Sequence, residues 1–141
     1  MMKKLSTLAK LTECGVVAVV RADSKEEAVK ISEACVEGGI KGIEVTFTVQ
    51  GADEVIKELA TLYKDNDDVV IGAGTVLDAV TARIAILAGA EFVVSPAFDA
   101  ETAKLCNLYS VPYMPGCMTI TEMKQALEAG VDIVKLFPGN A

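Results

Sequence analysis

Residues 16–46 read VVAVVRADSKEEAVKISEACVEGGIKGIEVT, and this stretch decides the expected fold. It begins with Val16–Val20 and ends with Gly42–Thr46, two short runs rich in β-branched residues that are typical of strands. The intervening Ser24–Gly38 repeats its apolar residues at helical spacing. The residues on that face are Ala28, Ile31, Ala34 and Cys35. The stretch therefore predicts a strand, a helix and a second strand.

Polar residues and glycines support the expected ends of the helices. Ser24 is a suitable N-cap, and Glu27 three residues later predicts a capping box. Gly39, Gly89 and Gly130 follow helical stretches, at positions where the backbone favours a positive φ.

The same alternation continues along the chain. Four further apolar runs are expected to form strands: Val69–Gly72, Glu91–Ser95, Val111–Met114 and Ile133–Phe137. Four further helical stretches are expected, one before each of these runs: Asp53–Tyr63, Asp78–Ala88, Asp99–Tyr109 and Thr119–Ala129. The first 15 residues predict a short amphipathic helix with Leu5, Leu8 and Leu11 on one side.

The strands are nearly continuous apolar runs, which indicates a parallel sheet covered by helices. Such an alternation forms either a doubly wound sheet or a (β/α) barrel. Polar residues follow several of the runs, and a site built from many strand ends is typical of a TIM barrel. We therefore expect residues 1–141 to form one domain of the TIM (β/α)8-barrel family.

Only about six of the eight βα units are present in this expectation, and a complete barrel typically has ~250 residues. The first and sixth strands would then be unpaired edges. Three explanations remain open: the chain is a C-terminally shortened fragment, another copy supplies the missing part, or the fold is open.

Composition excludes several classes of function. The chain has no histidine, which excludes histidine-based catalysis and histidine metal ligands. Its formal net charge of −7 disfavours a general nucleic-acid binder. No apolar run is long enough to span a membrane, and the N-terminus does not resemble a signal peptide. Four cysteines without a CxxC pair indicate reduced thiols, so a cytoplasmic location is expected.

Lys135 and Glu44 are the strongest candidates for catalysis. Lys135 lies within an apolar run, where an isolated ammonium must find a partner or lose its proton. Only a neutral amine attacks a ketone, so a desolvated lysine suits nucleophilic catalysis. Glu44 alternates with Ile43 and Val45, which predicts that its carboxylate faces inward. The two side chains form either a base and nucleophile pair or a structural ion pair.

Two further residues suit anion binding. Thr75 follows Gly72-Ala73-Gly74, where glycines let backbone N–H groups approach an anion and the hydroxyl adds a donor. Arg21 ends the first strand and is a candidate for binding a carboxylate or phosphate. A simple turn at Thr75 and a structural role for Arg21 remain equally open. The acidic stretch at residues 65–68 is expected to be a solvated loop, not a calcium site.

Six short motifs occur in order and together carry a resemblance. They are Arg21 after VVAVV, Ile43-Glu44-Val45-Thr46, Gly72-Ala73-Gly74-Thr75-Val76, Val94-Ser95-Pro96, Met114-Pro115-Gly116 and Val134-Lys135-Leu136-Phe137-Pro138. Over nearly the whole chain, the sequence resembles the bacterial 2-keto-3-deoxy-6-phosphogluconate (KDPG) and 4-hydroxy-2-oxoglutarate (KHG) aldolase family. The resemblance implies a class I aldolase on a TIM barrel, usually a homotrimer, that uses no metal or other cofactor.

The resemblance also implies roles for individual residues. Lys135 would form a Schiff base with the substrate ketone, and Glu44 would be the general acid and base. Thr75 would hold the carboxylate of the pyruvyl group, while Pro96 and Phe137 would line the pocket. The products would be pyruvate and an aldehyde, either glyceraldehyde 3-phosphate or glyoxylate.

The sequence departs from the family at one binding position. Many members have an arginine four residues after the glutamate, where this sequence has Thr48. Thr48 remains a substrate-binding candidate, and Arg21 is the residue that would compensate. The usual phosphate-binding loops of a TIM barrel follow the seventh and eighth strands, which residues 1–141 do not include.

Two other functions compete with the aldolase. One is an inactive fragment that acts as a self-assembling module through its exposed sheet edges. The other is a sugar-phosphate isomerase or epimerase that uses Glu44 as its base. Lys135 separates the aldolase from the second alternative, since isomerisation does not require an imine.

Overall fold

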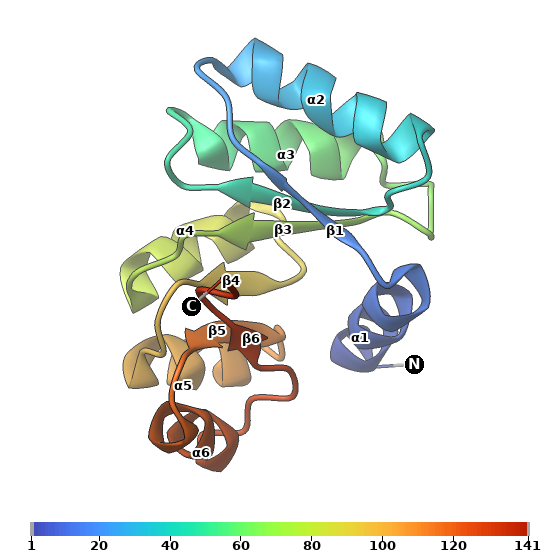
Figure 1. Cartoon of the computed structure of the whole chain (residues 1–141). Helices are drawn as coiled ribbons and strands as arrows, with labels where there is room; N and C mark the ends of the chain where they lie inside the picture. Colours follow the sequence, from blue (N-terminus) through green and yellow to red (C-terminus); the bar gives the residue numbers. More distant parts are fainter. Residues whose placement is uncertain (1, 141) are drawn as a thin grey trace.

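The structure, a computed structural model, describes residues 2–140 and alternates helices with strands (Figure 1). Its elements are α1 (Lys3–Cys14), β1 (Val17–Val20), α2 (Lys25–Glu37), β2 (Gly42–Thr46), α3 (Ala52–Leu62), β3 (Val70–Gly74), α4 (Ala79–Ala88), β4 (Val93–Ser95), α5 (Ala100–Leu108), β5 (Tyr113–Cys117), α6 (Ile120–Glu128) and β6 (Lys135–Leu136).

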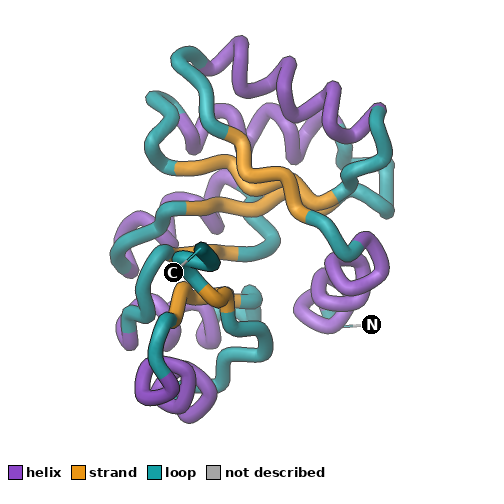
Figure 2. The backbone as a smooth tube through the Cα atoms, in the orientation of Figure 1, coloured by secondary structure: helices purple, strands orange, loops and turns teal. Residues whose placement is uncertain are grey.

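The strands form one parallel sheet in the order β1-β2-β3-β4-β5-β6. A doubly wound sheet would reverse its strand order at a switch point, so this order excludes it. The sheet curves, and α2 to α5 follow its outer side as neighbours (Figure 2). The prediction of six βα units of a TIM-type barrel is therefore confirmed, with β1 and β6 at the two edges of a half-barrel.

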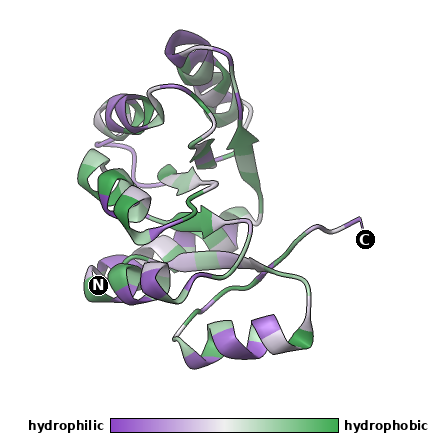
Figure 3. Cartoon of the chain, turned by 90° about the vertical axis from the view of Figure 1, so that its left-hand side faces the viewer, coloured by the Kyte–Doolittle hydropathy of each residue, from purple (hydrophilic) through white to green (hydrophobic). Residues whose placement is uncertain are grey.

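The main core lies between the sheet and the helices outside it. In β2, Ile43 and Val45 are fully buried in this core, and the partly buried Phe47 packs against it. Helix α3 contributes Val55, Ile56 and Leu59. Figure 3 shows the helices banded in hydrophilic and hydrophobic colours, as expected for helices that bury only one face.

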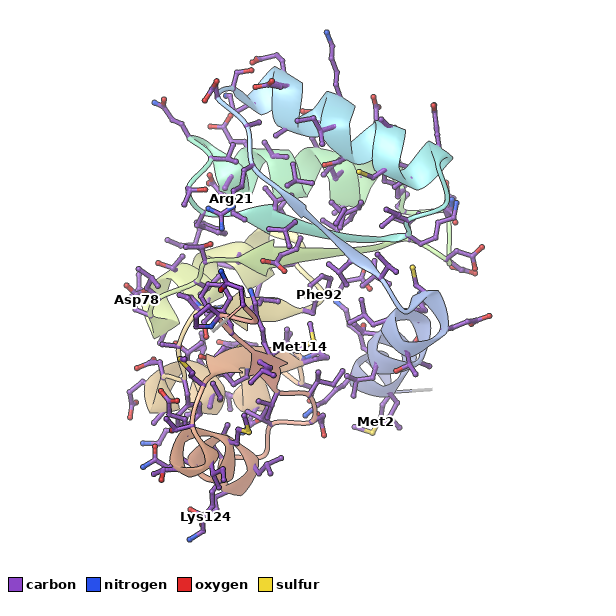
Figure 4. The ribbon with its side chains drawn as sticks, in the orientation of Figure 1. Met2, Arg21, Asp78, Phe92, Met114 and Lys124 are labelled. Carbon is purple, nitrogen blue, oxygen red and sulfur yellow. The ribbon has the colours of Figure 1, made fainter. Side chains whose placement is uncertain are left out.

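A second, smaller core fills the inner side of the curved sheet. It joins Val70, Phe92, Val94 and Met114 to Leu11 of α1. The ring of Phe92 occupies the space where a side chain at Gly72 would lie, so a glycine is required there. Figure 4 shows Phe92 and Met114 between the sheet and α1, away from the strand end that carries Arg21. Helix α1 therefore closes the amino-terminal end of the half-barrel.

An ion pair links α1 to the end of the chain that carries β6. Lys4 Nζ lies 2.9 Å from Asp132 Oδ2, and Asp132 precedes β6. One face of α1 is buried through Thr7 and Leu11, whereas Leu5 is 53% exposed. The prediction that Leu5 shares the buried face with Leu11 is therefore wrong, because the buried face is centred on Thr7.

The helix ends follow the expected cap chemistry. Ser24 Oγ accepts a hydrogen bond from the Glu27 backbone N–H, at 3.1 Å. The Glu27 carboxylate accepts from the N–H of Asp23 instead of Ser24, so the predicted capping box is shifted by one residue. The glycines predicted after helices, Gly39, Gly89 and Gly130, all have positive φ.

Five of the six strands within residues 2–140 differ from the predicted ranges, and the differences at β5 and β6 concern the site. β5 begins at Tyr113 and includes Pro115 and Gly116, two residues that rarely form the interior of a strand. β6 contains only Lys135 and Leu136, and Leu136 is 63% exposed. The expectation that both faces of this strand are covered is therefore wrong. No helix within residues 2–140 is long and apolar enough to cross a membrane.

Candidate active site

Five of the seven predicted site residues follow the carboxyl-terminal ends of strands, and the other two lie within strands. Arg21 follows β1, Thr48 follows β2, Thr75 follows β3, Pro96 follows β4 and Phe137 follows β6, while Glu44 and Lys135 lie within β2 and β6. In Figure 4, Arg21 lies at the same end of the sheet as Asp78, the N-cap of α4. Parallel pairing thus collects residues that are far apart in the sequence.

Glu44 is the only Asp, Glu, Lys or Arg side chain within residues 2–140 that is fully buried, at 5% exposure. Its carboxylate lies over Gly74 of the neighbouring strand, where any Cβ atom would overlap it. Gly74 is therefore required for this placement of Glu44. Burial raises the pKa of Glu44 above its ordinary value, and the positive charges of Lys135 and Arg21 partly oppose that rise.

A buried carboxylate with a raised pKa exchanges a proton more readily near neutral pH than an ordinary glutamate. Within residues 2–140, the Glu44 carboxylate has no ion-pair partner at salt-bridge distance. Its two cationic neighbours act on it only through space. The carboxylate is therefore available to a molecule that enters the inner side of the sheet.

Lys135 faces the same inner side as Glu44. It is paired in register with Gly116, and its Nζ lies 4.8 Å from the centre of the Phe137 ring. The side chain is half-buried, which is less than the sequence predicts. The aromatic ring holds the Lys135 side chain in place without a carboxylate partner. The nitrogen is therefore not engaged in an ion pair and can be reached by a ligand.

The two threonines after Glu44 connect β2 to the end of β1. Thr46 is fully buried, and its hydroxyl donates to the Val20 carbonyl at 3.1 Å. Its oxygen also lies 2.7 Å from the hydroxyl oxygen of Thr48, which is exposed. Thr48 is therefore linked through Thr46 to the backbone next to Arg21, and both exposed residues, Thr48 and Arg21, lie at the rim of the site.

Thr75 has an unusual backbone conformation. Its φ is +54°, in the left-handed region that β-branched residues avoid. Both residues next to Thr75 form backbone hydrogen bonds to neighbouring segments. The Phe47 N–H donates to the Gly74 carbonyl, and the Val76 N–H donates to the Val94 carbonyl. Strain of this kind persists where the surrounding structure imposes it, and it is concentrated at functional sites.

Pro96 and Gly116 are in direct contact beside Lys135. The carbonyl of Pro96 occupies the space where a Cβ atom at Gly116 would lie. Since Gly116 is paired with Lys135, the loop after β4 packs against the strand next to the amine. A glycine at position 116 is therefore required for this close approach.

We expect Gly116→Ala to destabilise the protein by about 3 kcal/mol, because the new methyl group meets a backbone carbonyl that has no rotamer to change. Urea unfolding of the two proteins measures the difference. Gly139→Ala is the matched control, because its Cβ atom would meet only ordinary contacts and its φ is not positive. The control is expected to change stability by less than about 0.5 kcal/mol. Equal effects of the two substitutions would contradict the assigned contact.

No group of three His, Cys, Asp or Glu side chains in the described part of the chain is placed to hold a metal ion. The groups gathered at the site are an amine, a carboxylate, a guanidinium and hydroxyls. Together they can bind an anionic carbonyl compound and move a proton next to an amine nucleophile.

Two residues near the site were not among the sequence-based candidates. Tyr113 is read from the sequence as an apolar strand residue, yet its hydroxyl bonds to the loop that carries Pro96. Gly116 enters the sequence analysis only as part of the Met114-Pro115-Gly116 motif. Their importance comes from contacts between segments that no local pattern reports.

Comparison with known proteins gives consistent matches. The family model "KDPG and KHG aldolase" matches residues 8–141. The chain is 42% identical over 125 residues to the 2-dehydro-3-deoxy-phosphogluconate aldolase of Treponema pallidum, covering 89% of this chain. It is 32% identical to the KHG/KDPG aldolase of Escherichia coli K12, covering 98% of this chain.

Solved structures agree with the sequence matches. The KDPG aldolase of Zymomonas mobilis ZM4, crystallised with 3-phosphoglycerate, matches with a TM-score of 0.83 and 32% identity, covering 95% of this chain and 62% of that chain. A KDPG aldolase from Legionella pneumophila, in which pyruvate was captured as a covalent carbinolamine, also matches with a TM-score of 0.83, at 27% identity, covering 99% of this chain and 65% of that chain. The chain spans 58% of the Treponema pallidum relative and 63% of the Escherichia coli one.

Proposed function

Because the chain belongs to the KDPG and KHG aldolase family, we propose that it acts as a Schiff-base aldolase on 2-keto acids. The substrate is 2-keto-3-deoxy-6-phosphogluconate, 4-hydroxy-2-oxoglutarate or both. The products are pyruvate and an aldehyde, which is glyceraldehyde 3-phosphate or glyoxylate. The observation that carries the proposal is the buried Glu44 carboxylate facing the same inner side as Lys135.

The proposed reaction begins at Lys135. Its neutral amine attacks the C2 ketone to form a carbinolamine, which loses water to form a protonated imine. Glu44 then takes the proton of the C4 hydroxyl, directly or through one water molecule. The C3–C4 bond breaks, its electron pair moves into the imine, and the aldehyde leaves.

The remaining steps restore the enzyme. The enamine takes up a proton at C3 and becomes the imine of pyruvate, which water hydrolyses to release pyruvate and the free amine. Glu44 is suited to return the proton that it removed, because burial keeps its pKa above the ordinary value. No step in this sequence uses a metal ion or a redox cofactor.

The other site residues have binding roles in this proposal. The Thr75 hydroxyl and the Arg21 guanidinium bind the substrate carboxylate, and Thr48 contributes a hydroxyl at the rim. Pro96 and Phe137 form walls of the pocket beside the amine. The short path from Thr48 through Thr46 to the backbone next to Arg21 supports a shared role at this end of the site.

We also propose that the protein is a cytoplasmic homotrimer. The four free cysteines support the location, because thiols remain reduced in that compartment. Large apolar side chains in and before α4 are exposed, which supports association of copies: Leu77, Val80, Ile84 and Leu87. Light scattering of the pure chain tests the association, and a monomer would contradict it.

Release of pyruvate tests the proposed reaction directly. The 141-residue chain is incubated with each of the two keto acids, and pyruvate is measured by its reduction with NADH and lactate dehydrogenase. We expect pyruvate and the matching aldehyde in equal amounts from at least one substrate. A folded chain that releases neither product would overturn the proposal. The alternative of an inactive assembly module receives no support from the curated relatives, which are named as aldolases.

A further inference from the structure

Tyr113 of β5 forms a hydroxyl cluster with the loop that follows β4. The tyrosine is buried at 4% exposure, and its Oη lies 2.7 Å from the Ser95 Oγ. The Asp99 backbone N–H donates to the same Oη at 3.2 Å. The Ser95 hydroxyl lies 2.7 Å from the Ala97 carbonyl. One aromatic side chain therefore holds both ends of the segment 95–99.

The distances define the direction of these hydrogen bonds. Ser95 has a single hydroxyl hydrogen, and the Ala97 carbonyl, which can only accept, uses it at 2.7 Å. The Tyr113 hydroxyl also lies 3.4 Å from the Ala97 carbonyl, but the shorter Ser95 contact assigns that carbonyl to Ser95, so we assign the Tyr113 hydrogen to Ser95. The N–H of Asp99 completes the arrangement by donating to Tyr113. Each polar atom of the cluster is thus satisfied inside the protein.

The cluster is connected to the candidate nucleophile through backbone contacts. The segment 95–99 includes Pro96, whose carbonyl packs against the backbone of Gly116. Gly116 is the strand partner of Lys135. Tyr113 and Gly116 belong to the same five-residue strand. The position of Pro96 relative to Lys135 is therefore determined by the hydroxyl of Tyr113 and by the contact at Gly116.

We propose that Tyr113 and Ser95 are positioning residues that hold Pro96 as the wall of the pocket beside Lys135 and thereby set the affinity for the keto acid. Neither side chain touches the substrate in this arrangement. Val94 and Met114 belong to the inner core, so the alternating neighbours Ser95 and Tyr113 lie on the helix side of the sheet. The inference rests on the proposed function, since the ligand it concerns is the keto acid.

The hydroxyl of Tyr113 suits this role because it remains a donor. Burial raises the pKa of Tyr113 above its ordinary value, so the phenol stays neutral over the physiological range. Loss of such a hydrogen bond is expected to disfavour the arrangement by about tenfold. A binding site whose wall is displaced loses affinity by a corresponding factor.

The test compares Tyr113→Phe, Ser95→Ala and the double variant with the unsubstituted 141-residue chain. Each protein is incubated with increasing pyruvate and cyanoborohydride, and the rate of reductive adduct formation at Lys135 is followed by mass spectrometry. We expect the half-saturating pyruvate concentration to rise by about tenfold in each single variant, and little further in the double variant. The maximal rate and its pH profile are expected to change less than about twofold, because Lys135 and Glu44 are unchanged.

The matched control is Tyr109→Phe, which removes a tyrosine hydroxyl at an exposed position and keeps the ring beneath Arg83. It is expected to leave the half-saturating concentration unchanged. Urea unfolding identifies any variant that does not fold, and Ser95→Ala then replaces Tyr113→Phe because it leaves the buried ring in place.

Three outcomes oppose the inference or its premise. An unchanged half-saturating concentration in a folded Tyr113→Phe or Ser95→Ala variant would overturn the positioning role. A lower maximal rate at unchanged half-saturation would also overturn it, because the defect would then lie in the chemistry. Absence of any adduct in the unsubstituted, folded chain would overturn the proposed function and the inference that rests on it.

Discussion

Replacement of Lys135 by methionine is expected to abolish the reductive adduct with pyruvate and to lower the rate of pyruvate release by at least about a thousandfold. The substitution removes the amine and keeps an unbranched side chain of similar length. Peptide mass spectrometry after treatment with pyruvate and cyanoborohydride measures the adduct. In the unsubstituted chain, the added mass is expected on the peptide that contains Lys135.

Lys135→Arg separates the role of the amine from that of the charge. The guanidinium keeps a positive charge next to the Phe137 ring and keeps the electrostatic attraction to Glu44. It does not lose its proton to become a nucleophile. We therefore expect this variant to fold normally and to form no adduct. An adduct that persists in either variant, at another lysine, would refute Lys135 as the site of the Schiff base.

The second large effect is expected for Glu44→Gln. Removal of the proton acceptor should lower the rate of pyruvate release by roughly a hundredfold to ten-thousandfold. The adduct with pyruvate is still expected, because Lys135 is unchanged. Steady-state assays across pH measure the effect. In the unsubstituted protein, activity should rise with pH through the raised pKa of Glu44, since the charged carboxylate is the base, and this rise should be absent in the variant.

Glu44→Gln is expected to lower activity but to raise the free energy of unfolding relative to the parent as pH rises. Burial raises the folded-state pKa of Glu44 above its ordinary value of 4.5, so the folded state binds a proton more tightly than the unfolded chain does. The resulting stabilisation is fully present below the ordinary pKa and is lost as pH rises through the folded-state pKa. Urea unfolding should therefore show that Glu44→Gln gains stability relative to the parent as pH rises through that range.

Glu91→Gln is the matched control for both effects. Glu91 precedes β4 at the amino-terminal end of the sheet, and burial also raises its pKa, against the opposing charges of Lys10 and Lys3. Its removal should alter stability with the same pH dependence and leave pyruvate release unchanged. Equal losses of activity in the two variants would refute a catalytic role for Glu44.

Much of the fold follows from local patterns. The valine-rich runs and the helical spacing between them predict the order of elements, and β2 is observed over the predicted residues, Gly42–Thr46. Alternation within that strand also predicts that Ile43 and Val45 face the helices and that Glu44 faces inward. These features depend on side-chain periods of 2 and 3.6 residues, which a short segment contains by itself.

Local patterns fail where neighbouring segments decide the outcome. β5 contains Pro115 and Gly116 because the paired strand and the loop carrying Pro96 hold them in extended conformation, against their intrinsic preferences. Tyr113 is an apolar strand residue in sequence but the donor to Ser95 in the fold. The outer face of β6 is exposed although Leu136 is apolar, because exposure depends on whether another segment packs on the strand and not on the strand's own residues.

The sequence by itself determined the βα alternation, the strand ends that carry polar residues and the inward direction of Glu44. Tertiary structure alone decided that the carboxylate of Glu44 lies over Gly74 and that Pro96 packs on Gly116 beside Lys135. It also decided that Tyr113 holds the loop that carries Pro96. The physical reason is that alternation is encoded within each segment. Close contact and pKa shifts arise only when the register of several strands brings distant residues together.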